Sequence, residues 1–412
     1  MKSKKIFLWV TVVLLMSLVS VNSQDRAIQA PSPGGYSMLK AQGEATVPFE
    51  LYRHHVIVQA EIGGKLLRLC VDTGFTAEGV ILHGGPHIDD MDLEYMSKIG
   101  VGGAGGSEPV PADLAVGVGV IFPGLELTNQ TCIVMPYDSI RAVAFEGEDG
   151  YIGGSLFNNF VVTLDYDKMT LTVTEPEKFD SSGSGEILPA GWLHDGAPTI
   201  SATADLPEGK AVSLQLVVDL GASHALSLNV KGHEDITLPE KRIEYSLGMG
   251  ILGEELGYIG RVQALHLGKY TLDHVITAFS DSEHLVQIEG EGNLGCVALQ
   301  RFLVIFDYGR RRMILEPNSR FNEPFEFNMS GLALRRMGDG TFRIDRIVPD
   351  SPGSEAGLEK GDVVVEINGR SPTQYNRDEV TELLQQEGER LHLTISRDGT
   401  MMHVTITLRR LI

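Results

Sequence analysis

Short apolar runs, separated by turn-forming residues, recur along most of the chain and are typical of β-strands. Two hairpins are predicted most clearly, one over residues 56–71 around a Gly-Gly turn and one over residues 198–218. Each hairpin runs into an Asp, one further residue and a Gly, at Asp72 to Gly74 and at Asp219 to Gly221. The pattern therefore predicts a mainly β protein with a carboxylate at the end of two buried strands.

A second pattern follows each Asp-x-Gly and repeats without a gap. The matching positions lie 142 residues apart and pair Gly150 with Gly292, Gly153 with Gly295, Phe160 with Phe302, Asp165 with Asp307, and Tyr166 with Tyr308. An internal duplication explains such a match better than coincidence. We expect two similar halves, residues 44–180 and 186–320, each large enough for a small core. In each half a glycine that ends a strand is predicted to precede a short helix, a strand and a hairpin.

The rest of the duplicated region is less regular. Residues 81–106 are rich in loop-forming residues, and the glycines within 100–106 are expected to form a mobile tip. Strands are predicted again at 112–120 and 131–135. A second glycine-rich segment covers residues 248–260.

A third module of mixed pattern is predicted over residues 325–412. Strands are expected at 342–348, 390–396 and 402–408. Asn376 and Glu379 have the spacing of a helix-starting capping box, and an apolar stripe at helical spacing follows them.

The repeated Asp-x-Gly suggests hydrolysis by paired carboxylates. A single copy is usually only a turn, but here each copy ends an apolar strand after a hairpin. Two carboxylates about 3 Å apart share one proton. The ionised group can take a proton from a bound water while the protonated group donates to the scissile carbonyl oxygen.

The two halves resemble the retropepsin-like aspartic proteases, through Val71-Asp72-Thr73-Gly74 and the glycine-ending strands 151–153 and 293–295. The resemblance implies two tandem acid-protease β-barrel halves forming a pseudo-dimer, with Asp72 and Asp219 as the catalytic pair. It assigns to Thr73 the hydrogen bond that locks the two loops. It also implies that glycine is needed where the strand ends and the Asp loops approach closely, and the sequence has glycine at these positions in both halves: Gly74, Gly221, Gly153 and Gly295. The glycine-rich segments 100–106 and 248–260 would correspond to flaps over the cleft.

Two residues depart from that family's motif. Leu220 replaces the second Thr or Ser, and Phe75 replaces a small residue. One lost hydrogen bond is worth about 1 kcal/mol, so activity need not be abolished, although the geometry of the pair is loosened. Two hypotheses therefore stay open: a secreted aspartic-type endopeptidase, and an inactive protease-like protein that binds peptide or acts as a scaffold.

The third module resembles a PDZ domain (β with two helices), and the combination resembles secreted bacterial aspartyl-protease-like proteins. Gly331, Leu332, Ala333 and Leu334 correspond to the loop whose backbone amides hold a peptide carboxylate, and the strand after it accepts a peptide at its edge. Peptide or unfolded-protein substrates and protein C-termini are the expected partners. A PDZ domain that only packs on the protease unit is the alternative.

Composition and charge narrow the partners and the compartment. The 412 residues carry a formal charge of −21, which argues against nucleic acid and anionic membranes. Residues 1–23 have the charged start and short apolar core of a signal peptide, and residues 24–43 are predicted as a linker, so a periplasmic or extracellular protein is expected, with no membrane anchor after cleavage. An uncleaved signal anchor is the alternative. We expect a monomer whose halves pair within one chain, rather than a homodimer.

Metal and disulfide chemistry are not expected to define the protein. The segment with His83, His87, Asp89 and Asp90 has a metal-like composition, but such glycine- and proline-rich loops are usually solvated turns. No metal and no cofactor are therefore predicted. Three cysteines allow at most one disulfide, whose partners among Cys70, Cys132 and Cys296 cannot be deduced.

Overall fold

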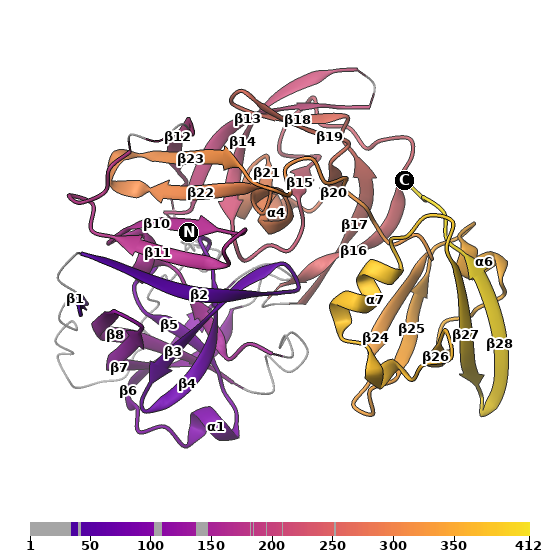
Figure 1. Ribbon diagram of the computed structural model, residues 1–412, viewed down its shortest axis with the longest axis horizontal. Helices are drawn as coiled ribbons and strands as arrows, with labels where there is room; N and C mark the ends of the chain where they lie inside the picture. Colours follow the sequence, from indigo (N-terminus) through magenta and orange to yellow (C-terminus); the bar gives the residue numbers. More distant parts are fainter. Residues whose placement is uncertain are drawn as a thin grey trace, which may run out of the picture.

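The computed structural model describes residues 34–39, 43–102, 109–136, 147–181, 183, 185–194, 196–207, 209–250 and 253–412. Figure 1 shows a large β unit with a smaller module beside it, as the mainly β prediction requires. The predicted signal peptide, most of the predicted linker and positions 103–106 of the first glycine-rich segment lie outside the described residues. None of the helices in the described ranges is long and apolar enough to cross a bilayer.

The first half surrounds the strand that leads to Asp72. Its elements are β1 (Gly35–Met38), β2 (Glu44–Tyr52), β3 (His55–Ile62), β4 (Lys65–Val71), β5 (Val80–His83), α1 (Pro86–Asp89), β6 (Glu94–Val101), β7 (Val110–Phe122), β8 (Leu125–Met135), β9 (Gly150–Ile152), α3 (Gly154–Phe157), β10 (Val161–Asp165) and β11 (Thr170–Thr174). The predicted hairpin is β3–β4, and Gly63 and Gly64 in its turn have φ of 56° and 75°, as a type I′ turn requires. β4 lies between β3 and β9, so Asp72 follows a strand paired on both sides.

The second half repeats this arrangement. Its elements are β12 (Glu186–Trp192), β13 (Pro198–Asp205), β14 (Ala211–Asp219), β15 (Leu226–Asn229), β16 (Ile243–Gly250), β17 (Gly253–Arg261), β18 (Ala264–Leu267), β19 (Tyr270–Asp273), β20 (Ile276–Ser280), α4 (Glu283–Glu289), β21 (Gly292–Gly295), α5 (Cys296–Leu299), β22 (Phe302–Asp307), η1 (Tyr308–Arg310) and β23 (Arg312–Pro317). β4 and β14 each pair in parallel with the glycine-ending strand, β9 or β21. β5 and β15 each pair antiparallel with that same strand. The duplication seen in the sequence is therefore a duplication of topology.

One sheet joins the two halves across a local two-fold axis. Its strand order is β2, β11, β10, β22, β23, β12, with antiparallel pairing throughout. At its centre Thr163 lies opposite Ile305, which is its own counterpart 142 positions later. Val162 and Leu164 lie opposite Phe306 and Val304, so the register is symmetric about that pair. The two halves of this one chain therefore meet in the way that the two subunits of a symmetric homodimer do, through the same surface on each half.

The less regular segments differ from expectation in three places. Residues 81–106, expected to be rich in loops, contain β6, which pairs with β7 in a long hairpin. Strand β1, within the segment predicted as a linker, pairs with β8. Helix α4 was not predicted at all, because seven residues are too few to show a clear helical period.

The C-terminal module is a separate five-stranded antiparallel sheet with its own core. Its elements are β24 (Leu332–Arg336), β25 (Phe342–Ile347), α6 (Pro352–Glu355), β26 (Val363–Ile367), η2 (Pro372–Gln374), α7 (Arg377–Leu383), β27 (Arg390–Arg397) and β28 (Thr400–Thr407). The predicted capping box is present at the start of α7. The Asn376 side chain accepts from the Glu379 backbone at 2.8 Å, and the Glu379 side chain accepts from the Asn376 backbone at 2.6 Å.

Candidate active site

The strand pairing brings the two Asp-x-Gly loops to one place. The backbone N–H of Asp72 donates to the carbonyl of Ile152 at 2.9 Å, and Asp219 lies in register with Gly295. A Cβ added to Gly153 would lie 2.1 Å from the carbonyl oxygens of Asp72 and Phe75, and one on Gly295 would lie 2.3 Å from that of His224. Both positions therefore require glycine so that the strand can pass close beside the loop.

The two carboxyl groups are hydrogen-bonded to each other. Each also accepts from the backbone N–H of the glycine two residues later, Gly74 for Asp72 and Gly221 for Asp219, at 2.7 Å in both halves. A Cβ on Gly221 would lie 2.7 Å from the carboxyl atoms of Asp72, so this glycine makes room for the opposite carboxylate. The structure thus places Asp72 and Asp219 together, with matching support.

Thr73 links the two loops through its side chain. Its hydroxyl donates to the carbonyl of Val218 at 2.7 Å and accepts from the backbone N–H of Leu220 at 2.9 Å. Leu220 has no hydroxyl with which to return these bonds, and its side chain is fully buried in the apolar core. Phe75, the other departure from the motif, is buried in a small apolar cluster with Cys70 and Tyr151. The Thr73 hydroxyl therefore makes both of its hydrogen bonds to the second loop, and the side chain of Leu220 makes none in return.

The environments of the two carboxylates differ. Asp72 is only 8% exposed, whereas Asp219 is partly exposed. Burial, and next the charge of Asp219, raise the pKa of Asp72 well above its ordinary value. At the same time the side-chain amide of Asn293 donates to Oδ2 of Asp219 at 2.9 Å. The shared proton is thus favoured on Asp72.

Three polar residues around Asp219 were not predicted as part of the site. Asn293 Oδ1 lies 3.2 Å from His224 Nε2, and the Asn293 side chain is also hydrogen-bonded to Glu289 at the end of α4. Burial and the charge of Asp219 raise the pKa of Glu289 to about 8, so this carboxyl is neutral at pH 7. One signal was available in the sequence, because Asn293 stands where the first half has Tyr151, between the matched pairs Gly150/Gly292 and Gly153/Gly295.

The residues with a metal-like composition do not gather into one site. His87 Nε2 pairs with Asp149 Oδ1 at 2.8 Å, and burial lowers the pKa of His83 to about 4. Within the described residues, the group of three potential metal ligands contains none of His83, His87, Asp89 and Asp90. All three cysteines are buried and free.

The C-terminal module has a hollow beside the loop that is predicted to hold a peptide carboxylate. Gly331 has φ of 74°, and an added Cβ would lie 2.2 Å from the side chain of Ser351, so this loop requires glycine. The Asn328 side chain holds the loop by accepting from Ser330 N–H at 2.9 Å and donating to the Leu332 carbonyl at 2.7 Å. A hollow of about 230 Å³ beside the loop is lined by Leu332, Leu334, Phe342, Val380 and Leu384, with Tyr245 of β16. Ala333 lies between Leu332 and Leu334 on β24 and is partly exposed.

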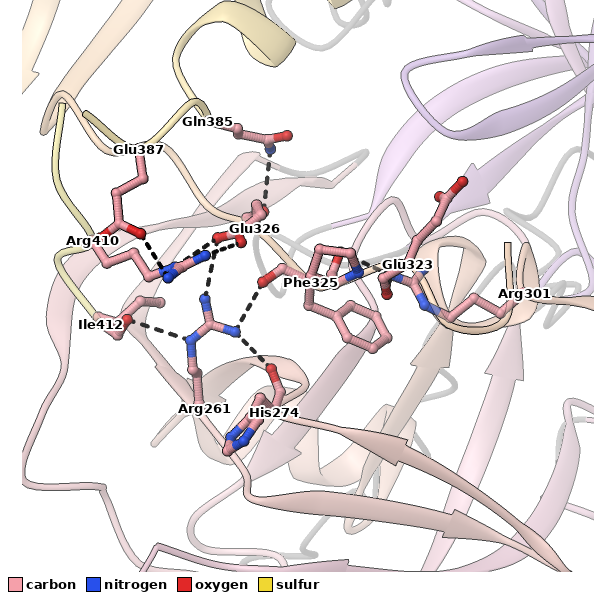
Figure 2. A network of polar contacts seen from close by, with 11 residues as sticks. Arg261, His274, Arg301, Glu323, Phe325, Glu326, Gln385, Glu387, Arg410 and Ile412 are labelled. Carbon is pink, nitrogen blue, oxygen red and sulfur yellow. Dashed lines mark hydrogen bonds and ion pairs between the residues drawn. The ribbon is translucent and has the colours of Figure 1, made fainter. Parts of the chain in front are cut away.

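The module is bound to the second half through the β16–β17 hairpin and a polar network. Ile243 and Ile259 of the hairpin pack with Val348 and Ile412 of the module. Figure 2 shows Arg261, whose guanidinium donates to the carbonyl oxygens of His274 and Phe325 and lies 3.8 Å from Glu326. Arg410 pairs with the same Glu326 and with Glu387. The hairpin that lines the hollow through Tyr245 therefore also contacts the module through Ile243, Ile259 and Arg261.

Comparison with known proteins identifies the C-terminal module. Residues 343–397 match the family model described as PDZ domain. The chain is 36% identical over 64 residues to "Serine protease HTRA1" of Xenopus tropicalis, covering 16% of this chain and 14% of that protein. It is 29% identical over 96 residues to "Probable periplasmic serine endoprotease DegP-like" of Marinomonas sp. (strain MWYL1), covering 23% of this chain and 19% of that protein. The chain thus spans less than a fifth of each of these relatives.

A search of solved structures found the aspartic proteinase from Irpex lacteus. It has a TM-score of 0.47 and 14% sequence identity, and it covers 68% of this chain and 99% of the other. The protein described here therefore combines a mainly β unit of two similar halves with a C-terminal PDZ domain.

Proposed function

We propose that the protein is an aspartic-type endopeptidase that cleaves peptide or unfolded-protein substrates with Asp72 and Asp219. The observation that supports this most is the hydrogen bond between the two carboxyl groups at the ends of duplicated strands. Ionising both groups would place two like charges in contact, so the pair holds one proton between them. Because residues 1–23 are predicted to be a signal peptide, we propose that this activity acts in the periplasm or outside the cell.

The asymmetry of the pair assigns a role to each carboxyl group. Asp219 is the base and takes a proton from a water molecule as the water oxygen bonds to the scissile carbonyl carbon. Asp72 is the acid and donates its proton to the carbonyl oxygen, because its pKa is raised by burial and by the charge of Asp219. The tetrahedral intermediate then returns a hydroxyl proton to Asp72 as the C–N bond breaks. The amine leaves with the proton that Asp219 had taken.

Inhibitors of different chemistry test the reaction type. Cleavage of an unfolded protein should be blocked by a peptide that carries a tetrahedral hydroxyl in place of the scissile amide, since such a compound imitates the intermediate. A fluorophosphonate, which reacts with activated serines, should leave cleavage unchanged. The reverse result would reject the aspartic mechanism in favour of the serine chemistry named in the relatives' descriptions.

The Asn293→Ala variant is expected to lower kcat/KM by about 10- to 100-fold, because a hydrogen bond to a charged group is worth about 1.5–3 kcal/mol. The change removes the amide donor 2.9 Å from Asp219 Oδ2. Steady-state kinetics on a fluorogenic peptide measure the effect. The control is Asn158→Ala, which removes an amide donor to Thr76 away from the pair. Equal losses in both variants would reject a specific role for Asn293.

The Thr73→Ala variant is expected to lower the free energy of unfolding by about 2–4 kcal/mol and to reduce kcat. Loss of the Thr73 hydroxyl leaves the buried Val218 carbonyl and Leu220 N–H without a hydrogen-bond partner. An unpaired buried polar group lowers the free energy of unfolding by more than the net value of the lost hydrogen bond. Urea unfolding and initial rates provide the measurements. The Thr73→Ser variant keeps the hydroxyl and should retain most of both quantities. A stability loss in Thr73→Ser as large as that in Thr73→Ala would show that the methyl group matters instead.

The second candidate is a peptide-binding scaffold without catalysis, and Leu220 is the observation that favours it. In both candidates we propose that the PDZ groove binds free protein C-termini, with the carboxylate held by the loop at Gly331 and Leu332. Calorimetry on an inactive full-length variant tests this role. A peptide ending in an apolar residue should bind, and the same peptide with an amidated end should bind at least tenfold more weakly. Equal binding of the two peptides would remove the carboxylate loop from the proposal.

A further inference from the structure

A buried group of three potential ligands lies beside the strand that leads to Asp72. His55 begins β3, Cys70 is near the end of β4, and Glu148 precedes β9. These strands are neighbours, because β4 pairs with both β3 and β9. One ligand atom from each side chain lies within 4.8 Å of the other two. The three residues are 3%, 0% and 6% exposed.

The donor set is one that zinc prefers. Imidazole nitrogen, thiolate sulfur and carboxylate oxygen are its usual protein ligands, at about 2.0–2.3 Å from the metal. A tetrahedral ion at those lengths separates its donor atoms by roughly 3.5 Å, so small side-chain movements suffice here. A thiolate and a carboxylate together carry the two negative charges that neutralise a divalent cation. The ion would thus allow both groups to be charged in a place where each alone would be costly.

Two further contacts support a ligand role. Glu148 Oε2 is buried and has no hydrogen-bond partner within the part of the chain that the structure describes, whereas Oε1 accepts from the Tyr151 hydroxyl at 3.3 Å. The His55 side chain is buried beside the backbone of Gly221. Metal-binding carboxylates are usually held by a second hydrogen bond such as the one from Tyr151 to Glu148. Glu148 therefore brings a buried oxygen, without a partner among the described residues, to a group whose three ligand atoms already lie within 4.8 Å of one another.

We propose that His55, Cys70 and Glu148 form a binding site for a borderline-soft divalent metal ion of the zinc type. The site has three protein ligands, which leaves a fourth position for water or a fourth ligand. It joins β3, β4 and the approach to β9, and it reaches the Gly221 loop of the second half through His55. Its existence does not depend on the proposed proteolysis, since a scaffold protein could use the same ion to fix these strands.

Cobalt titration of the full-length protein, after treatment with a chelator, tests the site without any measurement of activity. One equivalent of Co²⁺ should produce a thiolate-to-cobalt charge-transfer band, and one equivalent of Zn²⁺ should remove it. Cys70→Ala should abolish the band. Cys132→Ala, which removes another buried thiol outside the group, should keep it. Asp72→Asn should also keep the band, so that loss of catalysis and loss of metal binding are distinguished.

A second variant covers the case in which Cys70→Ala does not fold, which circular dichroism would reveal. Glu148→Gln keeps the thiol and should weaken Co²⁺ binding at least tenfold. Absence of the band in the unchanged protein, or its persistence in Cys70→Ala, would overturn the proposal. Unchanged affinity in Glu148→Gln would overturn the assignment of the carboxylate.

Discussion

The Asp72→Asn variant is expected to lose about 10³- to 10⁴-fold in kcat/KM, the largest effect that the proposed mechanism predicts. The amide has almost the shape of the carboxyl group, so the hydrogen bond from Gly74 N–H can be kept. An amide cannot hold the shared proton and deliver it to the carbonyl oxygen, which is the role proposed for Asp72. Cleavage of an unfolded protein, followed by the release of labelled fragments, measures the loss.

The control for this variant is Asp165→Asn. Asp165 ends β10 and pairs with Lys168 at 2.7 Å, away from the catalytic pair, and its counterpart in the second half is Asp307. This control should cleave at the rate of the unchanged protein. If Asp72→Asn did so too, the catalytic proposal would fail and the scaffold function would take its place. Binding of free C-termini at the PDZ groove should be the same in all three proteins.

The pH dependence of the rate provides an independent check on the same residue. Because the pKa of Asp72 is raised, Asp72 keeps its proton to a higher pH than an ordinary aspartic acid does. Activity should therefore persist to a higher pH than an ordinary aspartic acid would allow, and then fall as the pH rises through this pKa, since the acid is lost. A rate that increased steadily toward alkaline pH would contradict the assignment of Asp72 as the acid.

The repeated features of the fold could be predicted from the sequence because they depend on local pattern. The two strands ending in Asp72 and Asp219, the glycines at 153 and 295, and the helix start at Asn376 all follow from spacing and residue type. The same patterns place the counterparts Thr163 and Ile305 on duplicated strands, and the structure then pairs them. Duplication carries long-range information, because two copies of one half tend to meet symmetrically.

The environment of the pair could not be predicted in the same way. Glu289 approaches Asn293 and Asp219 only because α4 packs beside β21, and no periodicity links those positions in the sequence. Tyr245 lines the hollow beside the Gly331 loop through contact between the second half and the PDZ domain. His55 and Glu148 lie 93 positions apart and meet only because β4 lies between β3 and β9. These contacts depend on tertiary packing, which a local sequence pattern does not encode.

The Glu289→Gln variant is expected to be more stable than the unchanged protein at pH 8 and equally stable near pH 4. The pKa of Glu289 is about 8 in the folded protein, against 4.5 for an ordinary glutamate, because burial and the charge of Asp219 disfavour its ionised form. Between these two values the folded protein keeps a proton that the unfolded chain releases. The free energy of unfolding therefore falls by about 1.4 kcal/mol for each pH unit, and the total reaches a few kcal/mol.

Urea unfolding at several pH values between 4 and 8 measures this slope. Glutamine cannot ionise, so the Glu289→Gln variant should lose this part of the slope. In the metal-free protein it should keep the part from Glu148, whose pKa burial raises to about 7. Glu283→Gln is the matched control, because it removes a carboxylate from the first turn of the same helix at a far more exposed position. If the two variants changed with pH in the same way, a buried neutral carboxyl beside Asp219 would be ruled out. The difference proposed between the surroundings of Asp219 and those of Asp72, a neutral third carboxyl beside Asp219, would then be rejected.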